Sequence, residues 1–392
     1  MDGLLLAENK AIIAKIQETT LDGWHRVDEL LVENQAAALY HVLEQFSLSE
    51  ARYFFIFALA AYGDAAMQRN NNQQQKSFFD WTQCEMTTSI VASFTGIPEE
   101  DIILPKLGND YENDSTILPH LIAIDRRRKK IILAIRGTYT NSELNKKFRG
   151  NSRSFLGGEA HFTIAQIAER VWETIGNDII DLLDANSGFE LIISAHSLGA
   201  GAATLLNLLL HDDARTKRRK FRTFAYASPP VFCPPASSRS TYYFFDKKFQ
   251  TCVNYINQYD CVPFLCEDSI LHQTAMIAAV DRTMTSPSER AKCLLGLEAP
   301  NAAMVREIRD LQREPLARSS PENSRAMSIP VCGNVWLWPS SESSMVSTTA
   351  AFQPFLADSL KMSAVGLFVH QDELRDHSPT MYEHVLQHTS EK

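Results

Sequence analysis

Apolar residues recur every three to four positions along the first 45 residues of the chain. This spacing places them on one face of a helix and predicts amphipathic helices. The Asp22-Gly23 pair interrupts the pattern, so we expect two or three helices rather than one. We interpret residues 1–48 as an N-terminal helical extension of a larger domain that spans residues 49–392.

A further helix is predicted to begin directly after Ser47. A serine at this position can accept a hydrogen bond from the backbone, and Glu50 follows three residues later, as in a capping box. The run of aromatic and apolar residues over 51–63 is typical of a helix packed against a core.

The pattern changes from residue 118 onwards to alternating strands and helices. Two apolar, β-rich runs flank five basic residues and predict a hairpin, and helix and strand patterns then alternate. The predicted elements are strands over 118–125 and 131–136, a helix over 162–183, a strand from 191, a helix after 197, and strands over 221–228 and 251–258. Such alternation predicts an α/β fold with a mainly parallel central sheet and helices on both faces.

The segment from about 267 to 328 does not follow this alternation. It contains a helical pattern over 291–311, and its flanking stretches carry prolines and charges of both signs. We interpret the segment as a cap or regulatory loop inserted into the domain. A strand pattern follows over 329–338, and a last helical pattern covers 378–388.

Residues 191–206 combine an apolar strand, a turn of small residues and an apolar helix around Ser197. A serine on such a turn presents its hydroxyl at the start of a helix, which is the arrangement of a nucleophile elbow. The strand and the helix pass close to each other there, which explains the small residues Ala195, Gly199 and Gly201. Alanine replaces the first glycine of the G-x-S-x-G pattern. Because five-residue patterns also arise by chance, other parts of the chain must support a hydrolase.

Composition excludes several classes of protein. The formal net charge of −9 argues against a general nucleic-acid binder. The seven cysteines are scattered and form no C-x-x-C pair, so we expect reduced thiols, no bound metal and a cytoplasmic protein. No stretch reaches the roughly 18 uncharged apolar residues that a membrane-spanning helix needs. We also expect no cofactor.

A serine nucleophile needs a histidine as general base and an acid that orients the histidine. In an α/β-hydrolase both follow the serine along the chain, at the carboxyl ends of strands. Asp260 directly follows the apolar strand over 251–258, and Val262-Pro263 ends the segment sharply. Asp260 is therefore the predicted acid, with a strand-end turn as the alternative interpretation. The remaining acidic candidates, Asp246, Asp268 and Asp281, lie before the strand or in the insertion.

His377 is the predicted general base, because it lies in the loop just before the terminal helix. From there its side chain can reach over the edge of the sheet toward the serine. His384, on the following helix, is the second candidate, and we interpret His196 as structural and Asp376 as a helix-start residue. The other histidines after Asp260 are His272, His370 and His388.

Acyl transfer also needs hydrogen-bond donors for the tetrahedral oxyanion. The backbone N–H of Leu198, at the start of the helix after the serine, is one candidate. The second candidate is Thr138, which follows the strand over 131–136 as part of Arg-Gly-Thr and offers both a backbone N–H and a hydroxyl. A simple turn is the alternative interpretation of Gly137-Thr138.

Taken together, these motifs resemble the class 3 lipase family, and most of all its sn-1-specific diacylglycerol lipase branch. The similar segments are Ile135-Arg-Gly-Thr138, Glu159-Ala-His161-Phe162, His196-Ser-Leu-Gly-Ala-Gly201, Tyr226-Ala-Ser-Pro-Pro230, Tyr259-Asp-Cys-Val-Pro263 and the run from Asp376 to Tyr382. They stand in the order of the family, which makes the resemblance more specific than any single motif. It implies an α/β-hydrolase fold, a triad of Ser197, Asp260 and His377, and a regulatory role for the insertion.

The resemblance further implies a serine lipase, a carboxylic ester hydrolase that acts on diacylglycerol or triacylglycerol through an acyl-enzyme intermediate. A phospholipase A1, a general carboxylesterase and an inactive lipase-like interaction scaffold are the alternatives. The substrate would lie in a membrane or lipid droplet, reached by peripheral contact through the N-terminal helices or the basic runs 126–130 and 217–220. Residues 142–150 stand where the family has a lid, and they are basic here. Ser286 and Ser320 each precede a proline and are candidate phosphorylation sites.

Overall fold

The computed structural model describes residues 3–18, 30–66, 86–105, 118–137, 152–234, 247–265, 267–313, 333–339, 351–359, 361–362 and 372–390. All structural statements below concern these residues.

The centre of the molecule is an eight-stranded sheet with the strand order β1-β2-β3-β6-β7-β9-β10-β11. Its strands are β1 (Ile102–Ile103), β2 (His120–Asp125), β3 (Lys130–Ile135), β6 (Glu190–His196), β7 (Phe221–Tyr226), β9 (Cys252–Asn257), β10 (Asn334–Pro339) and β11 (Phe352–Ala357). The five strands from β3 to β10 are parallel, whereas β1, β2 and β11 pair antiparallel at the two sides. The predicted hairpin and the mainly parallel sheet are therefore confirmed.

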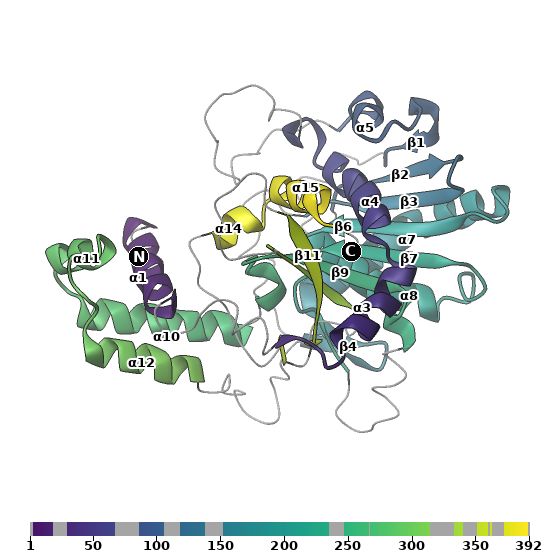
Figure 1. Ribbon diagram of the computed structural model, residues 1–392. Coiled ribbons are helices and arrows are strands. Elements are labelled where there is room, and N and C mark those ends of the chain that lie inside the picture. Colours follow the sequence, from purple (N-terminus) through teal and green to yellow (C-terminus); the bar gives the residue numbers. More distant parts are fainter. Residues whose placement is uncertain are drawn as a thin grey trace.

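Helices cover both faces of this sheet (Figure 1). On one face lie α4 (Leu48–Ala60), α5 (Thr88–Thr95) and α15 (Pro379–His388), and on the other lie α7 (Phe162–Ala185) and α8 (Leu198–Asp212). The alternation of side chains along β3 explains this arrangement: Ile132 and Ala134 pack toward α4, while Leu133 and Ile135 pack toward α7 and α8. The layered α/β-hydrolase architecture thus follows from strands that are apolar on both faces.

Several short elements had no clear signal in the sequence. A second sheet has three antiparallel strands, β4 (Ser152–Phe155), β5 (Gly158–His161) and β8 (Phe232–Cys233). The edge strand β11 and the short helix α14 (Glu373–Asp376) lie before the terminal helix. Three 3-10 turns complete the described structure, at Gly63–Ala66, Glu99–Asp101 and Val262–Phe264.

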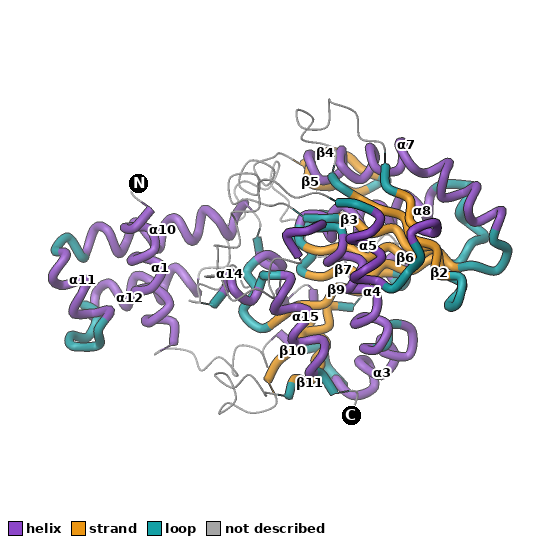
Figure 2. Tube along the Cα trace, turned by 90° about the horizontal axis from the view of Figure 1, so that it is seen from above, coloured by secondary structure: helices purple, strands orange, loops and turns teal. Residues whose placement is uncertain are grey.

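The N-terminal segment divides between two places. Helix α3 (Gln35–Gln45) packs beside the edge strand β11, and the Gln35 side chain bonds the backbone of Leu356. Helix α1 (Gly3–Glu18) instead packs with the insertion helices α10 (Glu267–Thr283), α11 (Pro287–Leu294) and α12 (Ala302–Arg313). We call these four helices the helical lobe. It projects from the α/β body in both views (Figures 1 and 2).

The inserted segment is therefore more regular than the sequence pattern indicated. Three helices occupy 267–313, and the helix expected over 291–311 is broken between α11 and α12. A buried polar cluster fastens α1 to them: Asn9 donates to Asp281 at 2.8 Å, and Arg290 donates to Asp281 at 2.9 Å and also bonds Asn9. Ile12, Ile13 and Ile16 of α1 pack against helices more than 250 residues away in the sequence, which a local pattern cannot show.

Among the helices that the structure describes, none is long and apolar enough to cross a membrane.

Candidate active site

Ser197 lies at the junction of β6 and α8 in a strained backbone conformation. Its φ and ψ angles are 59° and −129°, a region that side-chain-bearing residues rarely adopt. The Ser197 N–H donates to the carbonyl of Tyr226 at 2.8 Å, which ties the turn to the neighbouring strand. This geometry agrees with the predicted elbow.

Two glycines allow the elbow to lie against the end of β3. A Cβ atom on Gly199 would lie 2.6 Å from the carbonyl oxygens of Ile135 and Arg136. A Cβ atom on Gly137 would lie 2.8 Å from the Cβ of Ser197. Both distances are shorter than real Cβ contacts, so the close approach of the backbones requires glycine at both positions.

His377 and Asp260 lie beside the serine in one hydrogen-bonded chain. His377 Nε2 is 2.8 Å from Ser197 Oγ, and His377 Nδ1 is 3.0 Å from both carboxylate oxygens of Asp260. A carboxylate only accepts, so Nδ1 carries the proton and Nε2 is left to accept from the serine hydroxyl. All three residues are almost fully buried. This is the geometry that a Ser-His-Asp triad needs.

The carboxylate of Asp260 is held by two further donors. The hydroxyl of Tyr382 donates to Oδ2 at 2.6 Å, and the N–H of Val262 donates to Oδ1 at 2.9 Å. The Tyr382 oxygen in turn accepts from the N–H of Asn257 at 3.1 Å. Burial, together with the nearby Asp260 charge, raises the pKa of Tyr382 well above its ordinary value. Tyr382 therefore stays a neutral donor that orients the acid.

His196 forms a hydrogen bond to the backbone of His377. Its Nε2 is 3.1 Å from the His377 carbonyl oxygen, and its Nδ1 is 2.9 Å from the hydroxyl of Tyr62. Because a carbonyl only accepts, Nε2 carries the proton, Tyr62 donates to Nδ1, and the Tyr62 oxygen accepts from the N–H of Gly137 at 3.2 Å. Burial lowers the pKa of His196 well below its ordinary value, with the neighbouring His377 acting in the same direction.

The rings of His196 and His377 also stack, with centroids 4.9 Å apart. His196 is thus a neutral structural residue, which agrees with its interpretation from the sequence. The sequence offered no sign of its partner Tyr62, because Tyr62 reaches it from the end of α4 only through the tertiary fold.

Asp376 was expected to start the terminal helix, and this interpretation is wrong. Ser378 caps α15 instead, accepting from the N–H of Met381. Asp376 ends α14, is fully buried, and accepts from the N–H of Tyr259 at 3.2 Å. Burial raises the pKa of Asp376 to about 7, although Arg375 acts against this shift.

The structure describes only part of the predicted oxyanion site. Leu198 is the first residue of α8, where helix geometry leaves N–H groups without intrahelical acceptors. Gly137 is in contact with the elbow, as described above, but Thr138 and the lid residues 142–150 lie outside the described residues.

The alternative candidates lie away from the serine or outside the described part. The ring of His384 is in contact with the rings of His388, on the same helix, and of Phe352, at the start of β11. His272 bonds the carbonyl of Leu311 within the helical lobe. Asp281 belongs to the polar cluster of the lobe, Asp268 lies on α10, and Asp246, His370 and Ser320 are outside the described residues.

In the ranges that the structure describes, no group of three or more His, Cys, Asp or Glu side chains could hold a metal ion.

Comparison with known proteins places the centre of the chain in a family. Residues 132–269 match the sequence profile of the family described as Lipase (class 3). Mouse diacylglycerol lipase-beta is 31% identical over 120 residues, which cover 29% of this chain and 17% of the mouse protein. Human diacylglycerol lipase-alpha is 27% identical over 127 residues, which cover 28% of this chain and 12% of the human protein. The chain thus matches less than a fifth of the length of these relatives.

A solved structure of the triacylglyceride lipase of Rhizomucor miehei is similar over 55% of this chain and 73% of that protein, with 16% identity and a TM-score of 0.39. The fold assignment itself rests on the strand order and the elbow described above. The segment that matches the profile includes Ser197, Asp260 and the end of β3. Residues 132–269 are thus similar to the class 3 lipase family, and diacylglycerol lipases are among the proteins that this part of the chain resembles.

Proposed function

We propose that this chain is a serine lipase that hydrolyses acylglycerol esters, with Ser197 as nucleophile, His377 as general base and Asp260 as the orienting acid. The observation that carries the proposal is the continuous hydrogen-bonded chain from the Ser197 hydroxyl through His377 to Asp260. The match of residues 132–269 to the class 3 lipase family supports an ester of glycerol as substrate. The names of the relatives favour diacylglycerol as the first substrate to test.

The reaction proceeds in two halves. His377 Nε2 takes the proton of the Ser197 hydroxyl as Oγ attacks the ester carbonyl carbon, and the carbonyl oxygen becomes an oxyanion. The proton then passes from His377 to the leaving glyceride oxygen, the ester bond breaks, and an acyl-serine remains. Water gives a proton to His377, attacks the acyl-serine, and releases the fatty acid while Ser197 regains its proton.

The oxyanion is stabilised at the start of α8. The N–H of Leu198 and the positive end of the helix dipole lie next to Ser197, where negative charge develops. Thr138 is proposed as the second donor because it directly follows Gly137, which is in contact with the elbow. Loss of one such donor typically lowers kcat by about 10²–10³.

A fluorophosphonate probe tests this function directly. The wild type should be labelled covalently at Ser197, and Ser197→Ala should not be labelled. Absence of labelling of the wild type, or equal labelling of both forms, contradicts the proposal and leaves a lipase-like scaffold. A panel of diacylglycerol, triacylglycerol, phospholipid and short-chain ester substrates then separates the lipase from a phospholipase A1 or a general carboxylesterase, since all three use the same nucleophile.

A further inference from the structure

The surfaces that the sequence suggests for lipid contact do not face the candidate site. Ile12, Ile13 and Ile16 of α1 are fully buried inside the helical lobe, so these three side chains are not available for contact with lipid. The basic run 126–130 links the end of β2 to the start of β3, and 217–220 precedes the start of β7. Both runs therefore lie at the amino ends of the parallel strands, whereas Ser197 follows the carboxyl end of β6.

The helical lobe exposes two leucines at its far end. Leu295 and Leu297 have exposed fractions of 73% and 72%, the highest among the described large hydrophobic side chains. They lie in the turn between α11 and α12, residues 294–299, which we call the lobe tip. Figures 1 and 2 both show this turn at the end of the lobe that is farthest from the sheet.

The lobe tip is a defined turn. Gly296 has a φ of +73°, its N–H bonds the carbonyl of Cys293 at 3.0 Å, and the N–H of Leu297 bonds the carbonyl of Lys292 at 2.9 Å. This pattern is a Schellman motif, in which glycine adopts the left-handed conformation after a helix. Lys15 of α1 adds bonds to the carbonyls of Cys293 and Leu294 at 2.9 and 3.0 Å. The fold thus holds two apolar side chains in solvent in a fixed arrangement.

The lobe tip carries little charge. Glu298 is its only charged residue and pairs with Lys292 at 3.2 Å, and Lys15 adds one positive charge at the carbonyls of Cys293 and Leu294. The exposed positions that follow Glu298 are Ala299, Asn301, Ala302 and Ala303, of which only Asn301 is polar. A mainly apolar surface matches the interior of a lipid layer. The single Lys15 ammonium, which already bonds two carbonyls, is not the cluster of basic residues that selects anionic headgroups over zwitterionic ones.

The position and size of the lobe tip favour a lipid layer over a protein partner. Two side chains cannot supply the roughly 800 Å² per partner that a stable protein interface buries. Shallow insertion into lipid needs no such area. The lobe also projects from the side of the sheet where α14 lies, directly before His377 (Figure 1). Insertion there would bring the candidate site toward the lipid.

We infer that the lobe tip inserts Leu295 and Leu297 into the surface of an uncharged lipid layer and holds the chain on the layer that contains its substrate. The inference rests on the proposed lipase function for the identity of that layer. Two leucines give weak, reversible attachment, weaker than that of a single myristoyl chain because their side chains bury fewer carbons. The α1 helix takes part indirectly, because Lys15 and the Asn9 cluster fix the turn.

Flotation with phosphatidylcholine vesicles tests the inference on the full chain. Leu295→Ser/Leu297→Ser should bind at least tenfold more weakly than the wild type. Tyr40→Ser is the matched control, since Tyr40 is 67% exposed but lies on α3, outside the lobe, and its binding should equal that of the wild type. Equal binding of the double variant and the wild type, or no binding of the wild type, overturns the inference.

Two further measurements separate the remaining outcomes. The double variant should hydrolyse a water-soluble short-chain ester as fast as the wild type, which shows that it is folded, and should lose activity on vesicle-borne diacylglycerol. Light scattering that shows a wild-type dimer and a monomeric double variant would assign the leucines to a second copy and overturn the inference. Ser197→Ala should still bind vesicles, so failure of the lipase function and failure of the lobe tip are distinguishable.

Discussion

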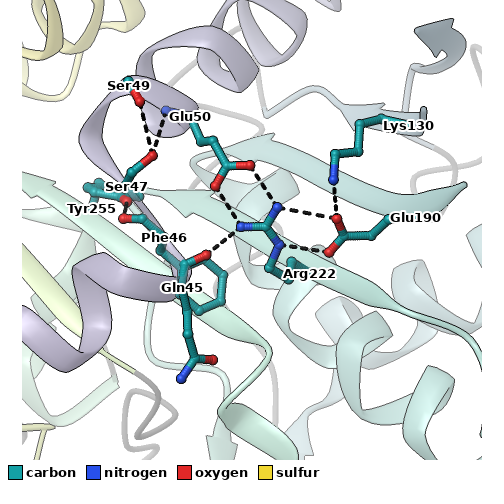
Figure 3. Close-up of polar contacts among 9 residues, drawn as sticks. All are labelled: Gln45, Phe46, Ser47, Ser49, Glu50, Lys130, Glu190, Arg222 and Tyr255. Atoms are coloured by element: carbon teal, nitrogen blue, oxygen red, sulfur yellow. Dashed lines mark hydrogen bonds and ion pairs between the residues drawn. The ribbon is translucent and has the colours of Figure 1, made fainter. Parts of the chain in front are cut away.

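Different polar networks lie at the two ends of the parallel strands, the carboxyl ends and the amino ends. At the carboxyl ends of the parallel strands, Ser197, His377 and Asp260 form a chain in which the carboxylate has specific neutral partners. At the amino ends, Arg222, Glu190 and other charged residues share several ionic bonds (Figure 3). Helix α4 contacts both networks: Glu50, in its first turn, belongs to the ionic network, and Tyr62, just beyond its end, belongs to the candidate site.

The ionic network is redundant. Arg222 donates to both oxygens of Glu50 at 2.7 and 2.8 Å and to Glu190 at 2.7 Å, and it also bonds the carbonyl of Gln45. Glu190 has a second partner in Lys130. Burial alone would raise the pKa of Glu190, but the bonds from Arg222 and Lys130 outweigh it and lower the pKa. Loss of Glu50 or Lys130 leaves Arg222 and Glu190 paired with each other, so only Arg222 is shared by both carboxylates. The candidate site, in contrast, has a single hydrogen-bonded path from Ser197 through His377 to Asp260.

Polar residues in this fold therefore have two separable roles, one in stability and one in catalysis. Residues of the ionic network fasten α4 and the α3–α4 junction to the sheet, so changes there should alter stability and leave the turnover of folded molecules intact. Residues at the carboxyl ends should alter turnover more than stability.

The largest effect is expected for Asp260→Asn. An amide can turn its N–H₂ toward His377 Nδ1, which stabilises the wrong tautomer and removes the acceptor at Nε2 for the serine proton. We expect kcat to fall on the order of 10⁴-fold, as for this change in other triads. Ester hydrolysis at saturating substrate measures it. Glu190→Gln, at the amino ends, should leave kcat within about twofold, and a comparable loss there would refute the separation of the two networks.

The next effect is on stability, for Arg222→Met. Methionine keeps much of the stem that packs near Phe46 and Phe224, but Glu50 then loses the guanidinium. Because the pair is only partly buried, we expect a loss of about 2–3 kcal/mol, somewhat below that of fully buried pairs. Urea unfolding measures this loss. Arg219→Met, which breaks the more exposed pair with Asp184, should cost less than about 1 kcal/mol. A fall in kcat per folded Arg222→Met molecule would argue against the separation.

Tyr62→Phe should lower activity, because the Tyr62 hydroxyl, just beyond the end of α4, positions residues of the candidate site. The change leaves Nδ1 of His196 and the N–H of Gly137 without the hydroxyl that joins them. A small shift of His377 follows, and we expect about a tenfold loss of kcat with KM little changed. Tyr255→Phe is the matched control, because its buried hydroxyl bonds the carbonyl of Phe46 near the ionic network. If the two variants lose the same activity, Tyr62 is merely structural.

Much of the α/β body could be predicted because its information is local. β3 and β6 are apolar runs bounded by charged or small residues, and the strained turn at Ser197 needs small neighbours in the sequence itself. Asp260 and His377 were predicted from their places after a strand and before a helix, and the structure brings both to Ser197.

Contacts between distant segments could not be predicted in this way. The helical lobe joins α1 to an insertion that begins at α10, and neither part reveals its partner by periodicity. The hydroxyl of Tyr62 meets His196 across 134 positions, and a two-residue strand such as β8 carries too little pattern to be recognised. Asp376 was misread because an acidic residue before a helix usually caps it, whereas Ser378 does so here.

Two buried carboxylates sharpen the comparison through their opposite pKa shifts. The pKa of Asp376 is raised to about 7 in the folded chain from 3.8, so the folded state binds its proton more tightly than the unfolded state. Ionisation of Asp376 therefore lowers the free energy of unfolding as pH rises from about 4 to 7, and this loss of stability is complete above pH 7. Glu190 has a lowered pKa, so its contribution is present above its ordinary value of 4.5 and is lost as pH falls through the folded pKa.

The smallest predicted effect follows for Asp376→Asn. The amide removes the cost of burying a charge, so the variant should be more stable than the wild type at pH 8 by at least about 1 kcal/mol. This advantage should shrink toward pH 5, where the wild-type carboxyl is protonated. Glu190→Gln should be less stable than the wild type at pH 8, and its deficit should shrink only below about pH 4.5. Urea unfolding of both variants across this range measures the two trends. If the stability differences of the two variants from the wild type changed with pH in the same direction, the two ends of the strands would not differ in how they stabilise charge.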